Sequence, residues 1–418
     1  MRAGYGRFSI TPAESFPLAG EVTLGERMAR EVADPLHATC ILLRDGHTNT
    51  AIVSVDLLII ERSLYEELSG IANQLGIQNL YISATHTHSS FGGYLSRDGA
   101  SLFMGRRRPA LRAKLVRGVR EAMKEALDDL KPVTELSWGS AGVPGLTMNR
   151  RERLGPKDDT VRFVQMSREA GPPVMVLSTS GHPVVMMVRR PNAASADYPG
   201  KLVETLARNG VKALFLIGAV GACNILFPEM DGGAEDHLAL LENLILGGLE
   251  QAMERGQRLD GSKASAKFMW APVKVTAQPS PILPWRDKEA MLSAVWSAVG
   301  RAFFRSLKER ATEVQLPIVK LGGAILVGMP ADYSVWAQQR VVETVDALGG
   351  MAIVSSHTND FIGYMHPRTQ YERNSEHNKQ FFHYENAMTW YGKGVADDLA
   401  DKAIESAAIL LPAGDLPN

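Results

Sequence analysis

The sequence has few of the features that mark secreted, membrane or nucleic-acid-binding proteins. Only two of its 418 residues are cysteines, Cys40 and Cys223, and both lie inside apolar runs. Two such thiols favour buried free cysteines over a disulfide scaffold. The 45 lysines and arginines nearly balance the 46 aspartates and glutamates. A net charge of −1 gives no reason to expect a nucleic acid partner or an anionic membrane surface.

Long hydrophobic runs are also missing. The apolar stretches are too short or too interrupted to form a membrane-spanning helix. The N-terminus, MRAGYGRFSITPAES, lacks the apolar segment of a signal peptide. We therefore expect a cytoplasmic protein with no membrane span. Its 45% hydrophobic content is typical of a globular chain that can bury a large core. No internal repeat or low-complexity tract divides the chain, and the oligomeric state stays open.

Strand-length apolar runs alternate with helical patterns along the chain. Residues 37–58 hold two such runs around an Asp-Gly turn, which predicts a β-hairpin. Between residues 110 and 130 an apolar residue recurs every four positions, which predicts an amphipathic helix packed on a sheet. Further helices are predicted over residues 61–75, 195–210, 235–255, 286–310 and 387–411. The alternation predicts one α/β domain over residues 1–418, with a mixed β-sheet core surrounded by helices and a covering insertion at 256–310.

The most informative stretch is SATHTHSS, residues 83–90, which follows a predicted strand over residues 79–83. Its two histidines, His86 and His88, stand at i and i+2 and can lie on one side of an extended segment. One imidazole can then bind a metal while the other stays free to carry a proton. A histidine-rich loop without chemistry is the alternative.

Three further predicted strands end in loops with candidate ligands. His182 follows residues 174–179, Asp332 follows residues 324–328, and Tyr364 lies beyond residues 352–355. Loops at strand ends are where α/β proteins build their sites. Two histidines, a carboxylate and a further oxygen suit a catalytic zinc.

Two other strand ends are less informative: one has two possible roles, and the other lacks a residue that nucleotide binding requires. Asp56 follows an apolar run and is interpreted either as an acid that supports a ligand or as a cap of the next helix. The loop GAVGACN, residues 218–224, contains glycines but lacks the lysine of a phosphate-binding loop, so nucleotide binding is rejected.

Seven matches to known motifs lie in order along nearly the whole chain. They are GRFSITP (6–12), VSVDLL (53–58), SATHTHSS (83–90), MNRRER (148–153), GHP with SADYPG (181–183 and 195–200), VGMPADYS (327–334), and NDFIGY with YENAMTWYG (359–364 and 384–392). Together they resemble the catalytic domain of the neutral/alkaline, non-lysosomal ceramidases. The resemblance implies that family's fold, and we expect its C-terminal immunoglobulin-like domain to be absent because the matches end near the C-terminus.

The resemblance also implies a metal and its ligands. The family holds one zinc with two histidines, an acidic residue and a tyrosine. Carried over to this sequence, the ligands of one zinc per chain are His86, His182, Asp332 and Tyr364. Asp332 stands where the family usually has a glutamate, so it keeps the charge but is one methylene shorter.

The family's catalytic groups carry over in the same way. His88 matches its proton-transfer histidine, Arg150 the arginine that contacts substrate or oxyanion, and Tyr384 the tyrosine that stabilises the developing oxyanion. The family's Gly-Asp-x-Ser-Pro motif is replaced here, and Asn224 stands at the position of its serine. Asn224 can still donate a hydrogen bond to an oxyanion. Cys223 beside it is either a nucleophile or a small buried thiol.

These assignments predict hydrolysis of an amide bond in a small N-acyl compound by attack of zinc-bound water. The alternatives are a zinc esterase or lactonase, a glycan-active enzyme or lyase on the same scaffold, and a non-catalytic binding protein. Five aromatic residues either line a pocket for an apolar part of the substrate or serve ordinary packing: Trp270, Trp285, Trp296, Phe381 and Phe382.

Overall fold

The computed structural model describes most of the chain. Outside the described part lie residues 22–24, 97–100, 153, 228–231, 278–297, 299, 302–304, 306–310, 372–383 and 412–418.

A mixed sheet of nine strands forms the larger half of the core. In spatial order its strands are β11 (Lys212–Ile217), β9 (Val174–Thr179), β8 (Thr160–Arg168), β6 (Lys131–Gly142), β1 (Arg2–Ser9), β3 (His37–Asp45), β4 (Thr48–Val55) and β5 (Asn79–Ala84), and β13 (Gln257–Asp260) pairs with β6. Strand β1 pairs with β3 along its whole length but with β6 only through Arg2 and Ala3. It therefore joins two smaller sheets into one.

A second sheet of four strands packs on the first. Its order is β14 (Ala266–Lys274), β15 (Glu313–Leu321), β16 (Ala324–Gly328) and β18 (Met351–Ser355). One hydrophobic cluster combines side chains of both sheets, for example Ile41 and Ile52 with Leu326 and Ile353, all fully buried. Apolar residues on the facing sides of two sheets thus exclude water between them.

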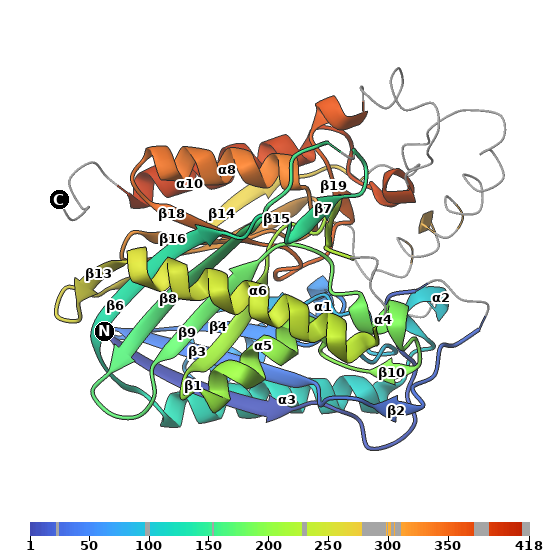
Figure 1. Cartoon of the computed structure of the whole chain (residues 1–418), viewed down its shortest axis with the longest axis horizontal. Coiled ribbons are helices and arrows are strands. Elements are labelled where there is room, and N and C mark those ends of the chain that lie inside the picture. The colour runs from blue at the N-terminus through green and yellow to red at the C-terminus, as the bar shows by residue number, and fades with distance from the viewer. Residues whose placement is uncertain are drawn as a thin grey trace.

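Helices cover the outer faces of both sheets, which gives four layers (Figure 1). The larger sheet carries α3 (Pro109–Asp128), α5 (Asp197–Arg208) and α6 (Ala234–Arg255), and the smaller sheet carries α8 (Val335–Ala347) and α10 (Val395–Leu410). Helix α1 (Arg62–Gln74) packs against α3 and β5. In α3 the side chains predicted to form an apolar stripe, including Leu111, Leu115 and Val119, are buried.

The remaining elements are short. They are β2 (Glu31–Val32), β7 (Thr147–Asn149), β10 (Ala193–Ala194), β12 (Cys223–Ile225), β17 (Asp332–Tyr333), β19 (Tyr364–Met365), α2 (Ser101–Met104), α4 (Val185–Arg189) and the 3₁₀ helix η1 (Tyr384–Met388).

Three pairs of parallel strands position the candidate site. The pairs are β4 with β5, β9 with β11, and β16 with β18. In each pair the chain passes through a helix (α1, α5 or α8) between the two strands. Parallel strands place their carboxyl ends at one edge of a sheet, and α/β proteins bind ligands at that edge. The loops that follow these strands carry the candidate ligands.

The predicted fold class, a mixed sheet surrounded by helices, is confirmed. The last predicted helix was wrong at its start, because residues 384–388 form a separate 3₁₀ turn and α10 begins only at Val395. The helix predicted over 286–310 lies mostly outside the described residues. Since β13 and β14 pair with β6 and β15, the first part of the proposed insertion at 256–310 belongs to the sheets. The single-domain assignment stays a prediction.

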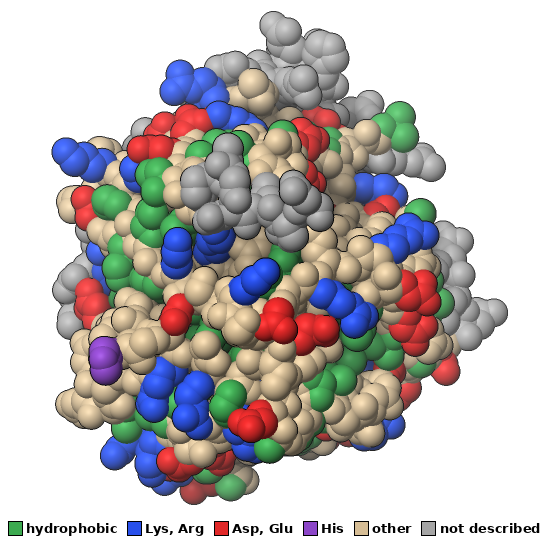
Figure 2. Space-filling view, turned by 90° about the vertical axis from the view of Figure 1, so that its left-hand side faces the viewer, with side chains coloured by type: hydrophobic (Ala, Val, Ile, Leu, Met, Phe, Trp, Pro, Cys, Tyr) green, Lys and Arg blue, Asp and Glu red, His purple; other side chains and the backbone are tan. Residues whose placement is uncertain are grey.

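Two surface properties complete the description. None of the helices among the described residues is long and apolar enough to cross a membrane. Figure 2 shows one face of the molecule, on which basic and acidic side chains are interspersed.

Candidate metal centre

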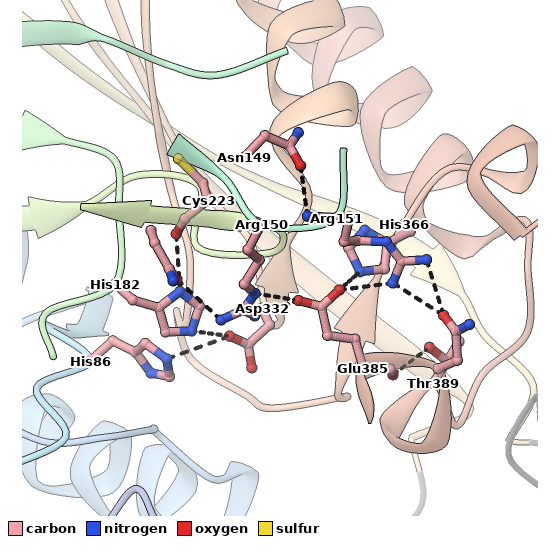
Figure 3. A network of polar contacts seen from close by, with 12 residues as sticks. His86, Asn149, Arg150, Arg151, His182, Cys223, Asp332, His366, Glu385 and Thr389 are labelled. Atoms are coloured by element: carbon pink, nitrogen blue, oxygen red, sulfur yellow. Dashed lines mark hydrogen bonds and ion pairs between the residues drawn. The ribbon is translucent and has the colours of Figure 1, made fainter. Parts of the chain in front are cut away.

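Three imidazole nitrogens lie within 4 Å of one carboxylate oxygen where residues of the two sheets meet. The Nε2 atoms of His86, His182 and His357 lie 3.5, 3.9 and 3.4 Å from Asp332 Oδ1. These residues follow β5, β9, β18 and β16, respectively. All four side chains are buried, and Figure 3 shows His86 and His182 directed at Asp332.

Backbone carbonyls orient the rings of this centre. His86 Nδ1 lies 2.8 Å from the Leu58 carbonyl oxygen, and His182 Nδ1 lies 3.0 Å from that of Cys223. Since a carbonyl can only accept, each Nδ1 carries the proton and each Nε2 has a free lone pair. Metal-binding histidines are commonly oriented in this way.

The donor atoms fit a divalent cation. Within the described part of the chain, His182 Nε2, His357 Nε2 and Asp332 Oδ1 are buried and have no hydrogen-bond partner. Buried polar atoms without partners are costly, and a bound cation would remove that cost. Two overlapping groups have donor atoms within 4.8 Å of one another: His86, His88 and His182, and His86, Asp332 and His357. Imidazole and carboxylate donors suit zinc.

Burial also sets the charge of the centre. Desolvation lowers the pKa of His86 and of His357 to about 3 and raises the pKa of Asp332 to about 6. For His86 the positive charge of a protonated His357 lowers the pKa further, while Asp332 opposes the shift. The histidines are therefore neutral at pH 7, which is the state that binds a metal.

The other predicted site residues surround this centre. His88 Nε2 lies 3.2 Å from His86 Nε2, and its Nδ1 lies 2.7 Å from the Gly20 carbonyl oxygen. Asp332 and Tyr364 are neighbours because β17 pairs with β19. Arg150 donates from Nη1 to Asn224 Oδ1 at 3.2 Å, and its guanidinium lies 5.9 Å from the centre of the Tyr364 ring.

The side chain of Tyr384, the remaining predicted site residue, lies outside the described part of the structure. Its backbone begins η1. The roles predicted for Tyr384 and for the other site residues stay predictions.

Three residues with ambiguous roles in the sequence have defined surroundings in the structure. Asp56 does not cap α1, whose N-cap is Glu61; it accepts hydrogen bonds from His37 N and Thr85 Oγ1 instead. Burial raises the pKa of the Cys223 thiol to about 12, so its nucleophilic form is disfavoured. Trp270 packs against Tyr65 and Phe268 and does not line the cavity that is described below.

The other four aromatic residues considered for a pocket wall lie outside the described residues. They are Trp285, Trp296, Phe381 and Phe382.

A buried acid that the sequence analysis passed over holds Arg150 in place. Glu385 Oε1 accepts from Arg150 Nε at 2.6 Å, and Glu385 Oε2 lies 2.8 Å from Arg151 Nη1 and 2.9 Å from His366 Nε2 (Figure 3). Burial alone would raise the pKa of Glu385, but Arg150, His366 and Arg151 hold it well below its usual value. Its place directly after Tyr384 in the YENAMTWYG motif was the available signal.

His357 was also missed as a candidate ligand. It stands two residues beyond β18, as His86 stands two residues beyond β5. The pattern of an apolar strand followed by a histidine, used for His86 and His182, applies to it equally.

A cavity of about 430 Å³ opens beside these donors. Its lining combines the polar residues of the centre with a larger number of apolar side chains. They are Gly20, Glu21, Leu58, Ile59, His86, His88, Phe103, Met148, Arg150, His182, Val184, Met187, Val188, Asn224, Phe227, Asp332, Phe361, Tyr364 and Met388. An apolar pocket with a few convergent polar groups is typical of a small-molecule site.

Comparison with known proteins shows the fold. No protein-family model matches the chain, and no curated protein matches it. Among solved structures, the neutral ceramidase from Pseudomonas aeruginosa superimposes with a TM-score of 0.78 at 17% sequence identity, covering 100% of this chain and 75% of that one. A ceramidase complexed with C2 gives 0.77 at 16% identity, covering 100% and 76%. The chain therefore has the α/β fold that is seen in the neutral ceramidases. Its candidate metal centre lies within that fold.

Proposed function

We propose that this protein is a zinc-dependent hydrolase that cleaves the amide bond of a small N-acyl compound. One observation carries the proposal: neutral, buried imidazoles and a carboxylate lie close together beside an apolar cavity, and His182 Nε2 and Asp332 Oδ1 have no hydrogen-bond partner among the described residues. That the fold is shared with ceramidases, which by their name act on ceramide, supports amide hydrolysis. Carboxylates and imidazoles around such a cavity suit metal-assisted hydrolysis.

One zinc ion would be held by His86, His182, Asp332 and Tyr364. When bound, it supplies Lewis acidity that polarises a carbonyl group and activates water near neutral pH. Asp332 contributes the negative charge that offsets the cation. The carbonyls of Leu58 and Cys223 bind Nδ1 of His86 and of His182, so Nε2 of each ring would be available to hold the ion.

His88 would move the proton that the departing amine requires. Burial, and after it the neighbouring His86, lowers its pKa well below the usual value, so the imidazole is neutral at pH 7. The bond to Gly20 O fixes the proton on Nδ1 and leaves Nε2 facing the centre. A positioned histidine commonly contributes about 10²–10⁴ to the rate.

Three further groups would stabilise the oxyanion that forms on the carbonyl. Arg150 supplies a fixed positive charge that Glu385 orients. Because Asn224 Oδ1 accepts from Arg150, its amide NH₂ remains to donate into the cavity. Tyr384 is assigned the same task from the resemblance alone. Preorganised donors of this kind stabilise developing charge more than they stabilise the ground state.

The lining of the cavity suits a substrate with an apolar portion. Leu58, Phe227 and Phe361 are among its lining residues, whereas Arg150 and Asn224 provide polar contacts near the donors. We propose that residues 1–418 act as a single catalytic domain and need no nucleic acid partner. The zinc esterase or lactonase is the competing assignment, because the same groups can attack an ester.

Parallel assays on amides and esters test the proposal. Zinc-loaded protein is offered N-acyl amides and the matching esters with short, medium and long acyl chains. We expect amine release from at least one amide, and its loss in Asp332→Ala but not in Asp260→Ala, an exposed acid on β13. Hydrolysis of esters alone would move the assignment to an esterase, and no turnover of either class would contradict hydrolysis.

A further inference from the structure

A buried carboxylate, that of Asp158, has no role in the proposed function. Only 5% of its side chain is exposed, and it lies two residues before β8. Its Oδ2 and Oδ1 accept from Arg162 Nη1 at 2.8 Å and from Nη2 at 3.1 Å. Burial alone would raise the pKa of Asp158, but the charge of Arg162 and the bonds to the carboxylate hold it below its usual value. The group is therefore ionised at pH 7.

Asp158 is bonded to the loop that carries His182. Its Oδ2 accepts from Ser180 Oγ at 2.6 Å, and Ser180 precedes His182 by two residues. Ser180 Oγ in turn accepts from Ala219 N at 2.9 Å, which ties this loop to the one that follows β11. That second loop leads to Cys223, whose carbonyl oxygen accepts from N and Nδ1 of His182 at 3.1 and 3.0 Å. The orientation of the His182 ring therefore depends on two loops that are joined beside Asp158.

The same carboxylate oxygen is bonded to the helix that follows Asp332. Gln338 Nε2, near the start of α8, donates to Asp158 Oδ2 and, at 3.2 Å, to Ser180 Oγ. Gln338 is only 2% exposed. Asp332 lies in β17, and α8 begins two residues after that strand ends. The loop of His182 follows a strand of the larger sheet, whereas α8 covers the smaller one. Asp158 thus connects the two sheets next to two of the proposed ligands.

The two ligands do not fix their own separation. His182 Nε2 lies 3.9 Å from Asp332 Oδ1, and neither atom has a hydrogen-bond partner among the described residues. Their spacing must therefore come from the elements that carry them. Groups that are held in place before a ligand arrives lose less freedom when it binds, so such a connection raises affinity.

We infer that Asp158 is a positioning residue that sets the separation of His182 and Asp332 before a metal binds. The inference rests on the proposed function in that these two residues hold the ion. Asp158 supplies no ligand and acts through Ser180 and Gln338. Its loss should therefore weaken metal binding while every ligand remains.

Asp158→Asn tests the inference, because it removes the charge and keeps the shape of the side chain. We expect zinc affinity, measured by competition with a chromogenic chelator on folded protein, to fall about tenfold, since outer partners of metal ligands contribute 10–100-fold. The visible spectrum of the cobalt-loaded protein should change, because the ligands are spaced differently. Zinc should also raise the melting temperature less than in the wild type. A purely structural role would lower the melting temperature equally with and without zinc.

Asp129→Asn is the matched control. Its Oδ2 accepts at 2.6 Å from Nη1 of Arg168, the last residue of β8, whereas Arg162 lies near the first. The control therefore breaks a carboxylate–arginine pair on the same strand but at its other end. Zinc affinity and the cobalt spectrum should stay as in the wild type.

Gln338→Met covers a failure of Asp158→Asn to fold. It leaves the pair of Asp158 with Arg162 intact and removes only the bonds to α8. Zinc affinity should again fall by about tenfold. Wild-type affinity and an unchanged cobalt spectrum in this variant, or in folded Asp158→Asn, would overturn the inference and leave the proposed function intact. If the wild type itself binds no metal, the proposed function fails and the inference fails with it.

Discussion

The histidines of the candidate metal centre are kept neutral by their surroundings. Desolvation lowers the pKa of His86 and His357 to about 3, and those of His88 and His182 fall well below the usual value. Protons therefore do not compete with a metal for these nitrogens near pH 7. The same property leaves His88 free to accept a proton. In the proposed mechanism, a ligand and a proton carrier would differ in whether the imidazole nitrogen contacts the ion.

Replacing His88 separates these two roles. We expect His88→Asn to keep about one zinc per chain and to lose about 10²–10⁴ of kcat, the usual contribution of a general acid–base group. Metal content by plasma mass spectrometry and steady-state amine release measure the two quantities on one sample. If the variant loses its metal, His88 is a ligand and its assignment as a proton carrier is wrong.

In the proposed mechanism, Glu385 would act by holding Arg150 in place rather than by contacting the substrate. Glu385→Gln removes the carboxylate that Arg150, Arg151 and His366 share, and leaves two buried guanidinium groups with weaker partners. Breaking a buried ion pair in this way costs about 3–5 kcal/mol of unfolding free energy. We expect kcat to fall more than KM rises, because the fixed charge serves the oxyanion. The control, Glu405→Gln, removes a surface pair with Lys402 and should cost at most about 1 kcal/mol.

The same carboxylate gives stability a pH dependence. Its folded-state pKa is held well below the ordinary value of 4.5, so Glu385 stabilises the fold above that value. The contribution is lost as the pH falls from 4.5 through the folded-state pKa. The free energy of unfolding, measured by urea between pH 6 and pH 3, should therefore fall more steeply below pH 4.5 for the wild type than for Glu385→Gln. Parallel curves would show that Glu385 keeps an ordinary pKa.

At the scale of elements, one glycine joins the loops that carry Asp332 and Tyr364. Gly363 has φ +96°, its carbonyl accepts from Asp332 N at 3.1 Å, and an added Cβ would lie 2.2 Å from the Met388 carbonyl oxygen. Gly46, in the turn between β3 and β4, also has positive φ (+56°), but an added Cβ there meets nothing within 4 Å.

Alanine at these two positions separates backbone strain from the clash. The free energy of unfolding should fall in both variants, because alanine is strained at positive φ. In Gly363→Ala it should fall by about 1–3 kcal/mol more, because the added Cβ forces the chain to move. Denaturant unfolding measures the difference. Zinc affinity should fall in Gly363→Ala alone, and equal losses in both variants would contradict the account.

Local patterns predicted many elements because their signals are local. The apolar spacing of α3 and the Asp-Gly turn between β3 and β4 lie within short windows of sequence. Strand β1 was not predicted, although it joins both halves of the larger sheet. Its importance lies in its partners, which are distant in sequence. Strand β15 and helix α8 were missed as well, since within residues 313–347 only the strand over 324–328 and the loop at Asp332 were predicted.

The candidate site was predictable in part for a similar reason. Each histidine or acid that follows a strand is visible in the sequence. The resemblance then assigned His86, His182, Asp332 and Tyr364 as the ligands of one ion. Which ends meet depends on the packing of one sheet on the other. His357 lies near Asp332 because β16 and β18 are parallel neighbours, and it lies near His86 because Ala84, the last residue of β5, donates to its carbonyl oxygen. No short window contains that information.

Taken as a whole, the molecule places three parallel strand pairs from two sheets around one point. The pairs β4–β5 and β9–β11 belong to the larger sheet and β16–β18 to the smaller one. Because the proposed ligands come from all three pairs, a bound ion would link the two sheets. The metal should therefore stabilise the entire fold and not just the loops.

Removal of the metal tests this coupling. A ligand that binds only the folded state adds about 4 kcal/mol at a concentration 1,000 times its Kd. We expect chelator-treated wild type to unfold at lower temperature than zinc-loaded protein, and zinc to restore the difference. In Asp332→Ala zinc should shift the melting temperature little. A wild-type melting temperature that ignores both chelator and zinc would contradict a metal that bridges the sheets.

The central claim is that one zinc ion at this centre drives amide hydrolysis, and a single titration tests it. Chelator-treated wild type receives zinc in steps, and bound metal and amine release from the best amide are followed together. The account predicts no turnover without metal and a joint rise that breaks at about one zinc per chain. Turnover in the metal-free protein, or zinc bound at full occupancy without turnover of any amide, would contradict it.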